Sequence, residues 1–227
     1  MTLPPTGVIL AAAGAGRRFG GAVPKALAPL AGRPMLFRPL GVFAALPFVR
    51  QIVVVLPRAW IGRVLRAHGR ELERLGVTDV VAGGRRRQDS VRAGLEVLRT
   101  PLVLVHDAAR PLITPRAVRE VARAAARHGA AVLAAPAVDT VKIADRRGRV
   151  LSTPERSRVW HAQTPQAFRT EVLRSAYRGA GRVDATDDTQ LVERAGGRVV
   201  IVPSRDPNFK VTTLEDLARA EKLLDRA

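Results

Sequence analysis

Short apolar runs of strand length alternate with segments of helix length along most of this chain, and this alternation restricts the folds it can form. The runs are rich in Val, Ile and Leu and occupy residues 8–11, 51–56, 78–82, 101–105 and 131–135. The helical segments between them occupy residues 34–46, 60–75, 89–98 and 115–128. Apolar strands separated by helices are typical of a mostly parallel sheet covered on both faces. The sequence therefore predicts an α/β fold of Rossmann-like architecture.

The alternation stops after Pro136. Two short segments flank the turn sequence Asp145-Arg146-Arg147-Gly148, which predicts a β-hairpin arm that projects from the sheet at about residues 138–158. Beyond the arm we expect a strand at 198–203 and helices at 169–178, 187–195 and 213–225. The last helix opens with Thr213-Leu214-Glu215-Asp216, a capping-box pattern. We expect residues 1–227 to form one domain that carries this arm.

The chain is strongly basic, with a formal net charge of +18 and 38 Lys and Arg residues, of which only four are lysine. Such a charge is compatible with binding to nucleic acid or to an anionic membrane surface. However, aromatic residues make up only 4% of the chain and are not interleaved with the arginines. The series Arg63-Arg66-Arg70-Arg74 has the spacing of a solvated helix face. We therefore expect no specific nucleic-acid partner, and a nucleic-acid-binding module is the competing hypothesis from another class.

The expected compartment follows from segments that the sequence lacks. No apolar run approaches the roughly 18 residues of a membrane-spanning helix, so we expect no membrane association. The first residues carry no basic side chain, which argues against an export signal. The absence of cysteine excludes disulfides, thiolate nucleophiles and cysteine-ligated zinc. We therefore expect a cytoplasmic protein.

A glycine-containing loop follows the first predicted strand, with the sequence AAAGAGRRFG at residues 11–20. Glycine lets backbone N–H groups approach phosphate oxygens, and Arg17 and Arg18 supply bidentate donors. The dinucleotide fingerprint is not met, because Phe19 stands where its third glycine would be, and the Gly-Lys-Ser/Thr sequence of ATPases does not occur. Taken alone, the loop fits a phosphate site and a plain glycine turn with solvated arginines about equally well.

Asp107 follows a predicted strand, in the sequence His106-Asp107-Ala108-Ala109-Arg110-Pro111. The carboxyl ends of strands are where open α/β sheets bind ligands, and a carboxylate oxygen there suits Mg²⁺. In isolation, a helix cap or a turn is the better interpretation of this aspartate. His106 and His161 invite a general-base interpretation, but we favour structural hydrogen bonding for both histidines.

Eight segments of the chain occur in an order that is informative as a set. They are AAAGAGRRFG, PK, GGRRRQDSV, LVHDAARP, VDTVK, RVWHAQTPQ, ATDD and NFKVT. Together they resemble the 2-C-methyl-D-erythritol 4-phosphate cytidylyltransferases of the non-mevalonate isoprenoid pathway. The resemblance implies that CTP and 2-C-methyl-D-erythritol 4-phosphate give 4-diphosphocytidyl-2-C-methyl-D-erythritol and pyrophosphate, by in-line attack of the substrate phosphate on the α-phosphorus. A ribitol 5-phosphate cytidylyltransferase is the alternative within the same class of enzyme.

The resemblance also implies roles for individual residues. Stabilisation of the transition state falls to Arg18 and Lys25, and positioning of the attacking phosphate to Arg156 and Lys210. The nucleotide pocket would be lined by Ala12, Ala13, Gly14, Gly16, Gly84, Ser90, Asp107 and Ala108. The sugar-alcohol phosphate would be bound by Arg110, Thr140, Thr164 and Thr186. Asp107 would hold Mg²⁺ or another divalent cation, and the hairpin arm would join two chains in a homodimer. Relatives carry an acidic or polar residue in place of Arg85, so we assign no base-recognition role to this position.

Overall fold

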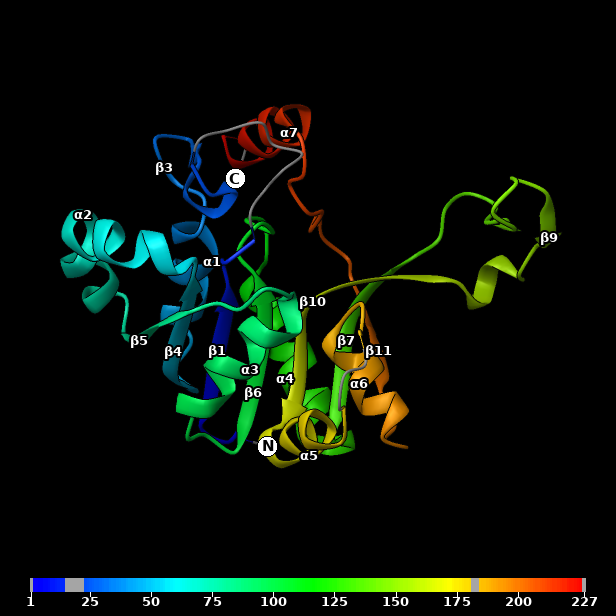
Figure 1. The fold of residues 1–227 in the computed structure, drawn as a ribbon, viewed down its shortest axis with the longest axis horizontal. Coiled ribbons are helices and arrows are strands. Elements are labelled where there is room, and N and C mark those ends of the chain that lie inside the picture. The colour runs from blue at the N-terminus through cyan, green and yellow to red at the C-terminus, as the bar shows by residue number, and fades with distance from the viewer. Residues whose placement is uncertain (1, 15–22, 181–183, 226–227) are drawn as a thin grey trace.

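A seven-stranded sheet forms the centre of the molecule in the computed structural model, which describes residues 2–14, 23–180 and 184–225 (Figure 1). From one edge to the other, its strands are β11 (Val200–Pro203), β7 (Ala130–Pro136), β10 (Trp160–Arg169), β6 (Leu102–Asp107), β1 (Thr6–Ala11), β4 (Val49–Leu56) and β5 (Val77–Ala82). Neighbouring strands are parallel except where β10 lies antiparallel to both β6 and β7. The predicted mostly parallel, Rossmann-like α/β fold is confirmed.

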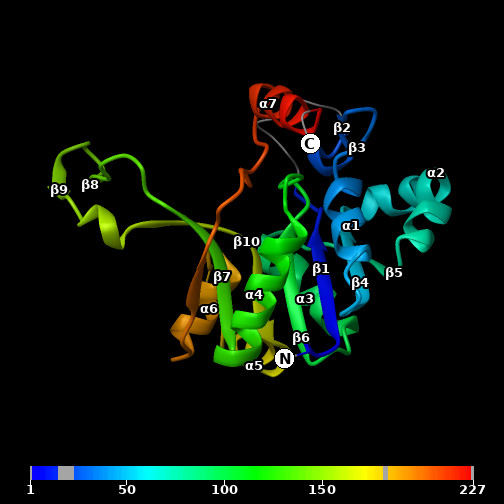
Figure 2. The same cartoon turned by 180° about the vertical axis from the view of Figure 1, so that it is seen from behind.

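Helices cover both faces of the sheet, as the views from front and behind show (Figures 1 and 2). One face packs against α1 (Phe37–Ala44), α2 (Ile61–Arg74) and α4 (Pro115–His128). The other packs against α3 (Arg87–Val97), α5 (Thr170–Gly179) and α6 (Asp188–Arg194). Alternation along β1 explains the two layers, because Val8 and Leu10 belong to the first core and Ile9 to the second. A strand that is buried on both faces reads as a continuous apolar run.

The helix ends follow local capping chemistry. Helix α4 begins and ends at the predicted residues, with Thr114 as its N-cap. Helix α7 (Leu214–Leu224) opens with the predicted capping box, in which Thr213 and Asp216 each accept a hydrogen bond from the other's backbone N–H. Helix α3 begins at Arg87 rather than at Asp89, because the Asp89 carboxylate reaches back to accept a hydrogen bond from the Arg86 N–H at 3.1 Å.

The sequence pattern does not predict β10, although this strand lies in the middle of the sheet. Its residues mix polar and apolar types without regular alternation and include Pro165, which normally argues against a central strand. The pairing with β7 is irregular between Ala162 and Gln166. Gln166 is buried, and its side chain donates to the Asp187 carboxylate and accepts from the Asp188 N–H. These tertiary hydrogen bonds satisfy a polar group that local patterning would place at the surface.

A small hairpin of β2 (Pro29–Leu30) and β3 (Arg33–Pro34) packs against α7. Leu30 and Ala220 lie in one apolar cluster, and the Ala31 N–H donates to the Glu221 carboxylate at 3.0 Å. Lys25 precedes the hairpin and Lys210 precedes α7 in the sequence. The contact therefore holds two lysine-bearing segments, from opposite ends of the chain, at the same end of the sheet (Figure 1).

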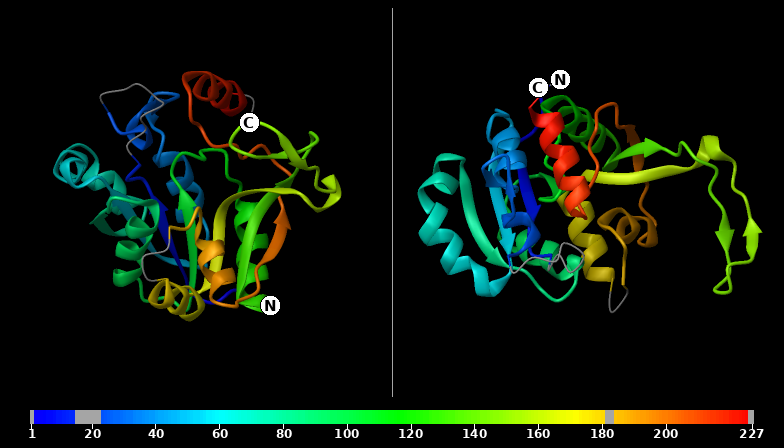
Figure 3. Two further views of the ribbon diagram at one scale, coloured as in Figure 1. Left: turned by 45° about the vertical axis from the view of Figure 1, so that its right-hand side comes forward. Right: turned by 90° about the horizontal axis from the view of Figure 1, so that it is seen from above.

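The segment between β7 and β10 forms an arm that extends away from the sheet (Figures 1 and 3). At its far end, β8 (Ile143–Ala144) pairs antiparallel with β9 (Val150–Ser152), which confirms the predicted hairpin. The Asp145 carboxylate closes the turn by accepting hydrogen bonds from the N–H groups of Arg147 and Arg149. The arm exposes the large apolar side chains of Val138, Ile143, Val150 and Leu151.

The series of arginines on α2 lies on an exposed helix face, as predicted. Arg63, Arg66, Arg70 and Arg74 are all exposed, so they contribute to the basic charge without entering the core. Within the part of the chain that the structure describes, no helix combines the length and the apolar character needed to cross a membrane.

Candidate active site

A cavity of about 670 Å³ lies beside the carboxyl ends of β1 and β6. This is the edge at which open α/β sheets bind ligands. The cavity wall consists of residues 11–14 at the end of β1, residues 84–87 with Ser90 around the start of α3, Asp107 and Ala109 at the end of β6, and Lys25, Ala26, Lys210 and Thr212. The wall therefore combines small residues with several cationic side chains, a composition that suits an anionic ligand.

Most of the residues predicted for nucleotide binding and catalysis meet in this cavity. They are Ala12, Ala13, Gly14, Lys25, Gly84, Ser90, Asp107 and Lys210. The strand order places the ends of β1 and β6 side by side, and the packing of the β2–β3 hairpin on α7 positions the two lysine segments. Gly16 and Arg18 lie outside the described residues.

Three other predicted residues do not line the cavity. Ala108 is fully buried, and its N–H donates to the Ala11 carbonyl at 3.1 Å, which ties the loops after β1 and β6 together. The Arg110 guanidinium donates to the Asn208 carbonyl at 2.7 Å. Thr186 is exposed just before α6, where its N–H donates to the side chain of Gln190.

Thr140 and Arg156 belong to the arm and are both exposed. The Arg156 guanidinium donates to the Val138 carbonyl, within the arm itself, at 3.2 Å. Since the arm extends away from the sheet (Figure 3), the structure of one chain does not bring these two residues to the cavity.

Two glycines at the end of β5 permit the close packing of this wall. A Cβ atom on Gly83 would lie 2.3 Å from the Ala13 Cβ, and one on Gly84 would lie 2.4 Å from the Asp89 Cβ. Both distances are too short for any larger residue without movement of the backbone. The Gly84 N–H donates to the Ser90 hydroxyl at 3.1 Å. Glycine at positions 83 and 84 therefore allows this part of the wall to pack closely against Ala13 and Asp89.

Asp107 is the only acidic residue among those that line the described part of the cavity. Its carboxylate accepts hydrogen bonds from two cations, Arg87 Nε at 3.1 Å and Lys210 Nζ at 2.6 Å. Burial by itself favours the neutral acid, but the charges of Arg87 and Lys210 outweigh it and hold the pKa of Asp107 well below its ordinary value. Asp107 is therefore an anion under all physiological conditions.

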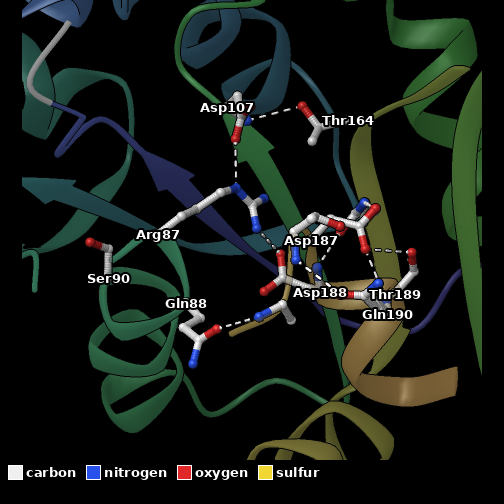
Figure 4. A network of polar contacts seen from close by, with 12 residues as sticks. Arg87, Gln88, Ser90, Asp107, Thr164, Asp187, Asp188, Thr189 and Gln190 are labelled. Atoms are coloured by element: carbon white, nitrogen blue, oxygen red, sulfur yellow. Dashed lines mark hydrogen bonds and ion pairs between the residues drawn. The ribbon is translucent and has the colours of Figure 1, made fainter. Parts of the chain in front are cut away.

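Arg87 connects Asp107 to a second carboxylate, Asp188, whose side chain is fully buried (Figure 4). Arg87 Nη1 donates to Asp188 Oδ2 at 2.6 Å, and the Tyr177 hydroxyl donates to Asp188 Oδ1 at 2.6 Å. Burial opposes the charge on Arg87, yet Asp188 and Asp107 together raise its pKa above the ordinary value. Burial and the neighbouring Asp188 raise the pKa of Tyr177, so this hydroxyl remains a donor.

Sequence reasoning assigns no role to Arg87 or Asp188. The signals are present in the runs Arg85-Arg86-Arg87 and Asp187-Asp188, but neither run shows which member turns inward. Arg86 pairs with the half-buried Asp89, whereas Arg87, at the first position of α3, reaches the buried acids. The two arginine side chains take different partners because Arg87 is the first residue of α3 and Arg86 is its N-cap.

Thr164 and His106 form a buried hydrogen-bonded chain with the backbone of Asp107. The Asp107 N–H donates to the Thr164 hydroxyl at 3.0 Å, and this oxygen lies 3.1 Å from His106 Nδ1. His106 Nε2 lies 3.1 Å from the Arg110 carbonyl, so it carries the proton, and Nδ1 accepts from Thr164. Burial lowers the pKa of His106 to about 4, which keeps the ring neutral. The structural hydrogen bonding predicted for His106 is confirmed. Thr164, which was predicted to bind the sugar-alcohol phosphate, is buried and does not line the cavity.

The donor set fits a divalent cation that is shared with a bound phosphate chain. In the described residues, no group of three or more His, Cys, Asp or Glu side chains could hold a metal by itself. Magnesium typically uses one or two carboxylates and completes its shell with water and substrate phosphates. Asp107, an ionised carboxylate on the wall of a cationic cavity, supplies one such ligand.

Comparisons with known proteins agree with this arrangement. A sequence model of the 2-C-methyl-D-erythritol 4-phosphate cytidylyltransferase family matches residues 6–226. The enzyme of that name from Symbiobacterium thermophilum is 43% identical over 225 residues, which cover 97% of this chain and 93% of the relative.

Two solved structures are similar over nearly their whole length. The 4-diphosphocytidyl-2C-methyl-D-erythritol synthase of Anaerococcus prevotii has a TM-score of 0.84 at 29% identity and covers 97% of this chain and 98% of its own. The 2-C-methyl-D-erythritol 4-phosphate cytidylyltransferase of Thermus thermophilus has a TM-score of 0.78 at 34% identity, with coverage of 96% and 98%. Sequence and fold agree over the same residues, and this chain therefore belongs to the 2-C-methyl-D-erythritol 4-phosphate cytidylyltransferase family.

Proposed function

We propose that this protein transfers a cytidylyl group from CTP to 2-C-methyl-D-erythritol 4-phosphate, with release of pyrophosphate. The observation that carries the proposal is the joint placement of Lys25, Asp107 and Lys210 in one cavity whose wall contains residues 11–14, the described part of the glycine loop. The family membership supplies the identity of the two substrates. The cationic cavity supplies a physical reason why two polyanions would bind together.

In this reaction an oxygen of the substrate phosphate attacks the α-phosphorus of CTP in line. A new P–O bond forms, the bond from the α-phosphorus to the bridging oxygen breaks, and pyrophosphate leaves with that oxygen. The nucleophile is already an anion, so no strong general base is needed. The barrier arises mainly from bringing negative groups together, and positioned cations lower it.

We assign stabilisation of the transition state to Lys25 and Arg18, and positioning of the attacking phosphate to Lys210 and Arg156. The first assignment is supported by the position of Lys25 on the cavity wall. The second is supported by the position of Lys210 beside Asp107, with Nζ and Oδ2 2.6 Å apart.

The nucleotide would lie against Ala12, Ala13 and Gly14 on one side and Gly84 and Ser90 on the other. Backbone groups and one hydroxyl dominate this wall, which suits the polar edge of a small base. We propose that the closely packed wall at Gly83 and Gly84 excludes the larger purine bases. Asp107 would hold Mg²⁺ or another divalent cation, which supplies charge neutralisation of the triphosphate when it is bound.

The arm is proposed to complete the site across a homodimer. Thr140 and Arg156 are exposed on an arm that leads away from the cavity of its own chain, and the arm exposes Val138, Val150 and Leu151. An apolar, extended hairpin of this kind suits a twofold contact in which each chain offers the same surface. Arg110, Thr164 and Thr186 are retained as proposed substrate-side residues, with Thr164 acting through Asp107.

The decisive assay measures pyrophosphate release from CTP and Mg²⁺ with either 2-C-methyl-D-erythritol 4-phosphate or ribitol 5-phosphate. We expect turnover with the former, and the same assay with ATP, GTP and UTP measures base selectivity. Turnover with ribitol 5-phosphate alone would support the alternative enzyme and refute this proposal.

Sharing of the site between chains can be tested by mixing two inactive variants. Lys25→Ala removes a cavity cation and Arg156→Ala an arm cation, so a mixed dimer contains one intact site. Random mixing should then restore about a quarter of the wild-type activity if each site draws on both chains. A mixture as inactive as its components would show that the arm does not serve the partner's cavity.

A further inference from the structure

The two oxygens of the Asp107 carboxylate have different partners. Oδ1 accepts a hydrogen bond from Arg87 Nε at 3.1 Å, and Oδ2 accepts one from Lys210 Nζ at 2.6 Å. The carboxylate is 11% exposed, so both contacts lie at the inner wall of the cavity. An anionic substrate and its cation would compete with Arg87 and Lys210 for these contacts.

Arg87 is held on its far side as firmly as on its near side. Its Nη1 donates to Asp188 at 2.6 Å, and the Asp188 side chain is 0% exposed. Asp188 is fixed in turn by the Tyr177 hydroxyl on Oδ1 and by its own N–H, which donates to Gln166. A guanidinium that bridges two carboxylates in fixed directions is held in one orientation.

Lys210 is held less firmly. Its side chain is 39% exposed, it lies in an irregular segment before α7, and Asp107 is its ion-pair partner in the structure. A flexible ammonium that is open to the cavity can move to a phosphate oxygen at little cost, whereas a half-buried guanidinium that is paired with two acids would have to break both ion pairs.

We propose that Arg87, anchored by Asp188, is a positioning residue that holds Oδ1 of Asp107 permanently and leaves Oδ2 to exchange Lys210 for the divalent cation. The inference rests on the proposed function, since it assumes that a nucleotide and its cation occupy the cavity. It assigns positioning roles to two residues, Arg87 and Asp188, in the proposed reaction. Arg87 fixes the direction of the carboxylate, and Asp188 balances the charge of Arg87, so that Asp107 still attracts a cation.

Asp188→Asn is the direct test, because it keeps the size of the side chain and removes its charge. The unbalanced Arg87 would then repel a cation at Asp107 and compete for both carboxylate oxygens. We expect Mn²⁺, used as a paramagnetic substitute for Mg²⁺, to bind the protein–CTP complex about tenfold more weakly, as is typical when a group that orients a metal ligand is lost. Free Mn²⁺ is measured by its electron paramagnetic resonance signal during titration.

Val192→Ala is the matched control. Val192 lies on α6 with Asp188, is 1% exposed and packs in the core, so its truncation loosens the same helix without changing any charge. This variant should lower the unfolding temperature and leave the Mn²⁺ affinity at the wild-type value. Equal Mn²⁺ affinities in Asp188→Asn and the wild type would overturn the positioning role.

Arg87→Lys provides a second measurement if Asp188→Asn does not fold. Lysine keeps the charge but cannot bridge Asp107 and Asp188 in two fixed directions, so the same weakening of Mn²⁺ binding is expected. Wild-type affinity in this variant would also overturn the inference. Failure of the unaltered protein to bind Mn²⁺ with CTP would instead overturn the cation assignment of the proposed function, and the inference with it.

Discussion

Titration of the buried His106 is expected to make the stability of this protein depend on pH. The ring donates from Nε2 to the Arg110 carbonyl and accepts from Thr164 at Nδ1, with both distances at 3.1 Å. A second proton would turn Nδ1 into a donor that faces the Thr164 hydroxyl in a site closed to water. Burial therefore lowers the pKa of His106 from 6.5 to about 4.

The sign of the effect follows from linkage. Because the folded-state pKa is depressed, the unfolded chain takes up the proton first as pH falls. The stability is therefore present above pH 6.5 and is lost progressively as pH falls towards about 4. At 1.36 kcal/mol per pKa unit, the interval corresponds to about 3 kcal/mol, of which about 2 kcal/mol falls between pH 7 and pH 4.5.

The measurement is urea unfolding, followed by circular dichroism, at several pH values between 7 and 4.5. The comparison is with His106→Gln, which retains one donor and one acceptor but does not titrate. We expect the free energy of unfolding of the wild type to fall by about 2 kcal/mol more than that of the variant over this range. The slopes are compared, so a uniform loss of stability in the variant does not affect the test. Parallel pH profiles for the two proteins would refute the assignment of a buried neutral ring.

Three further predictions concern the cations and the arm. Lys25→Ala should lower the turnover number by roughly 10²–10³, since it removes a charge aimed at the transition state; steady-state pyrophosphate release measures this, and near-wild-type turnover would remove the assigned role. Lys210→Ala should lower turnover and also raise the KM for the sugar phosphate, whereas a change in the KM for CTP alone would contradict its assignment to the attacking phosphate. Leu151→Asp places a charge on a residue of the arm that is 66% exposed and should shift the protein from dimer to monomer in light scattering, with unchanged circular dichroism. A dimer that persists in this variant would show that the contact lies elsewhere.

The sequence made most of the cavity predictable, because its residues occur in short motifs. Lys25 and Lys210 are two of only four lysines in a chain that otherwise uses arginine, and both occupy motif positions that line the cavity with Asp107. The position of Asp107 at the end of an apolar strand is by itself typical of a helix cap or a turn, and its predicted role rests on the resemblance of the whole set of motifs. The roles assigned to Thr140 and Arg156 could not be derived from one chain, because the arm places both residues away from its own cavity.

Local patterning determined the elements that bury their apolar residues regularly. The parallel strands, α4 and the capped start of α7 follow from periodicity and capping, which act over a few residues. The hairpin arm follows from its turn residues and the break in the alternation.

Only the tertiary structure decided the position of β10 and the orientation of Arg87. Both depend on polar contacts with residues distant in the sequence: Gln166 hydrogen-bonds to Asp187 and the Asp188 N–H, and the half-buried Arg87 pairs with Asp107 and Asp188. Hydrophobic periodicity carries no information about such partners, since desolvation of a polar side chain is offset only when the chain has closed around it.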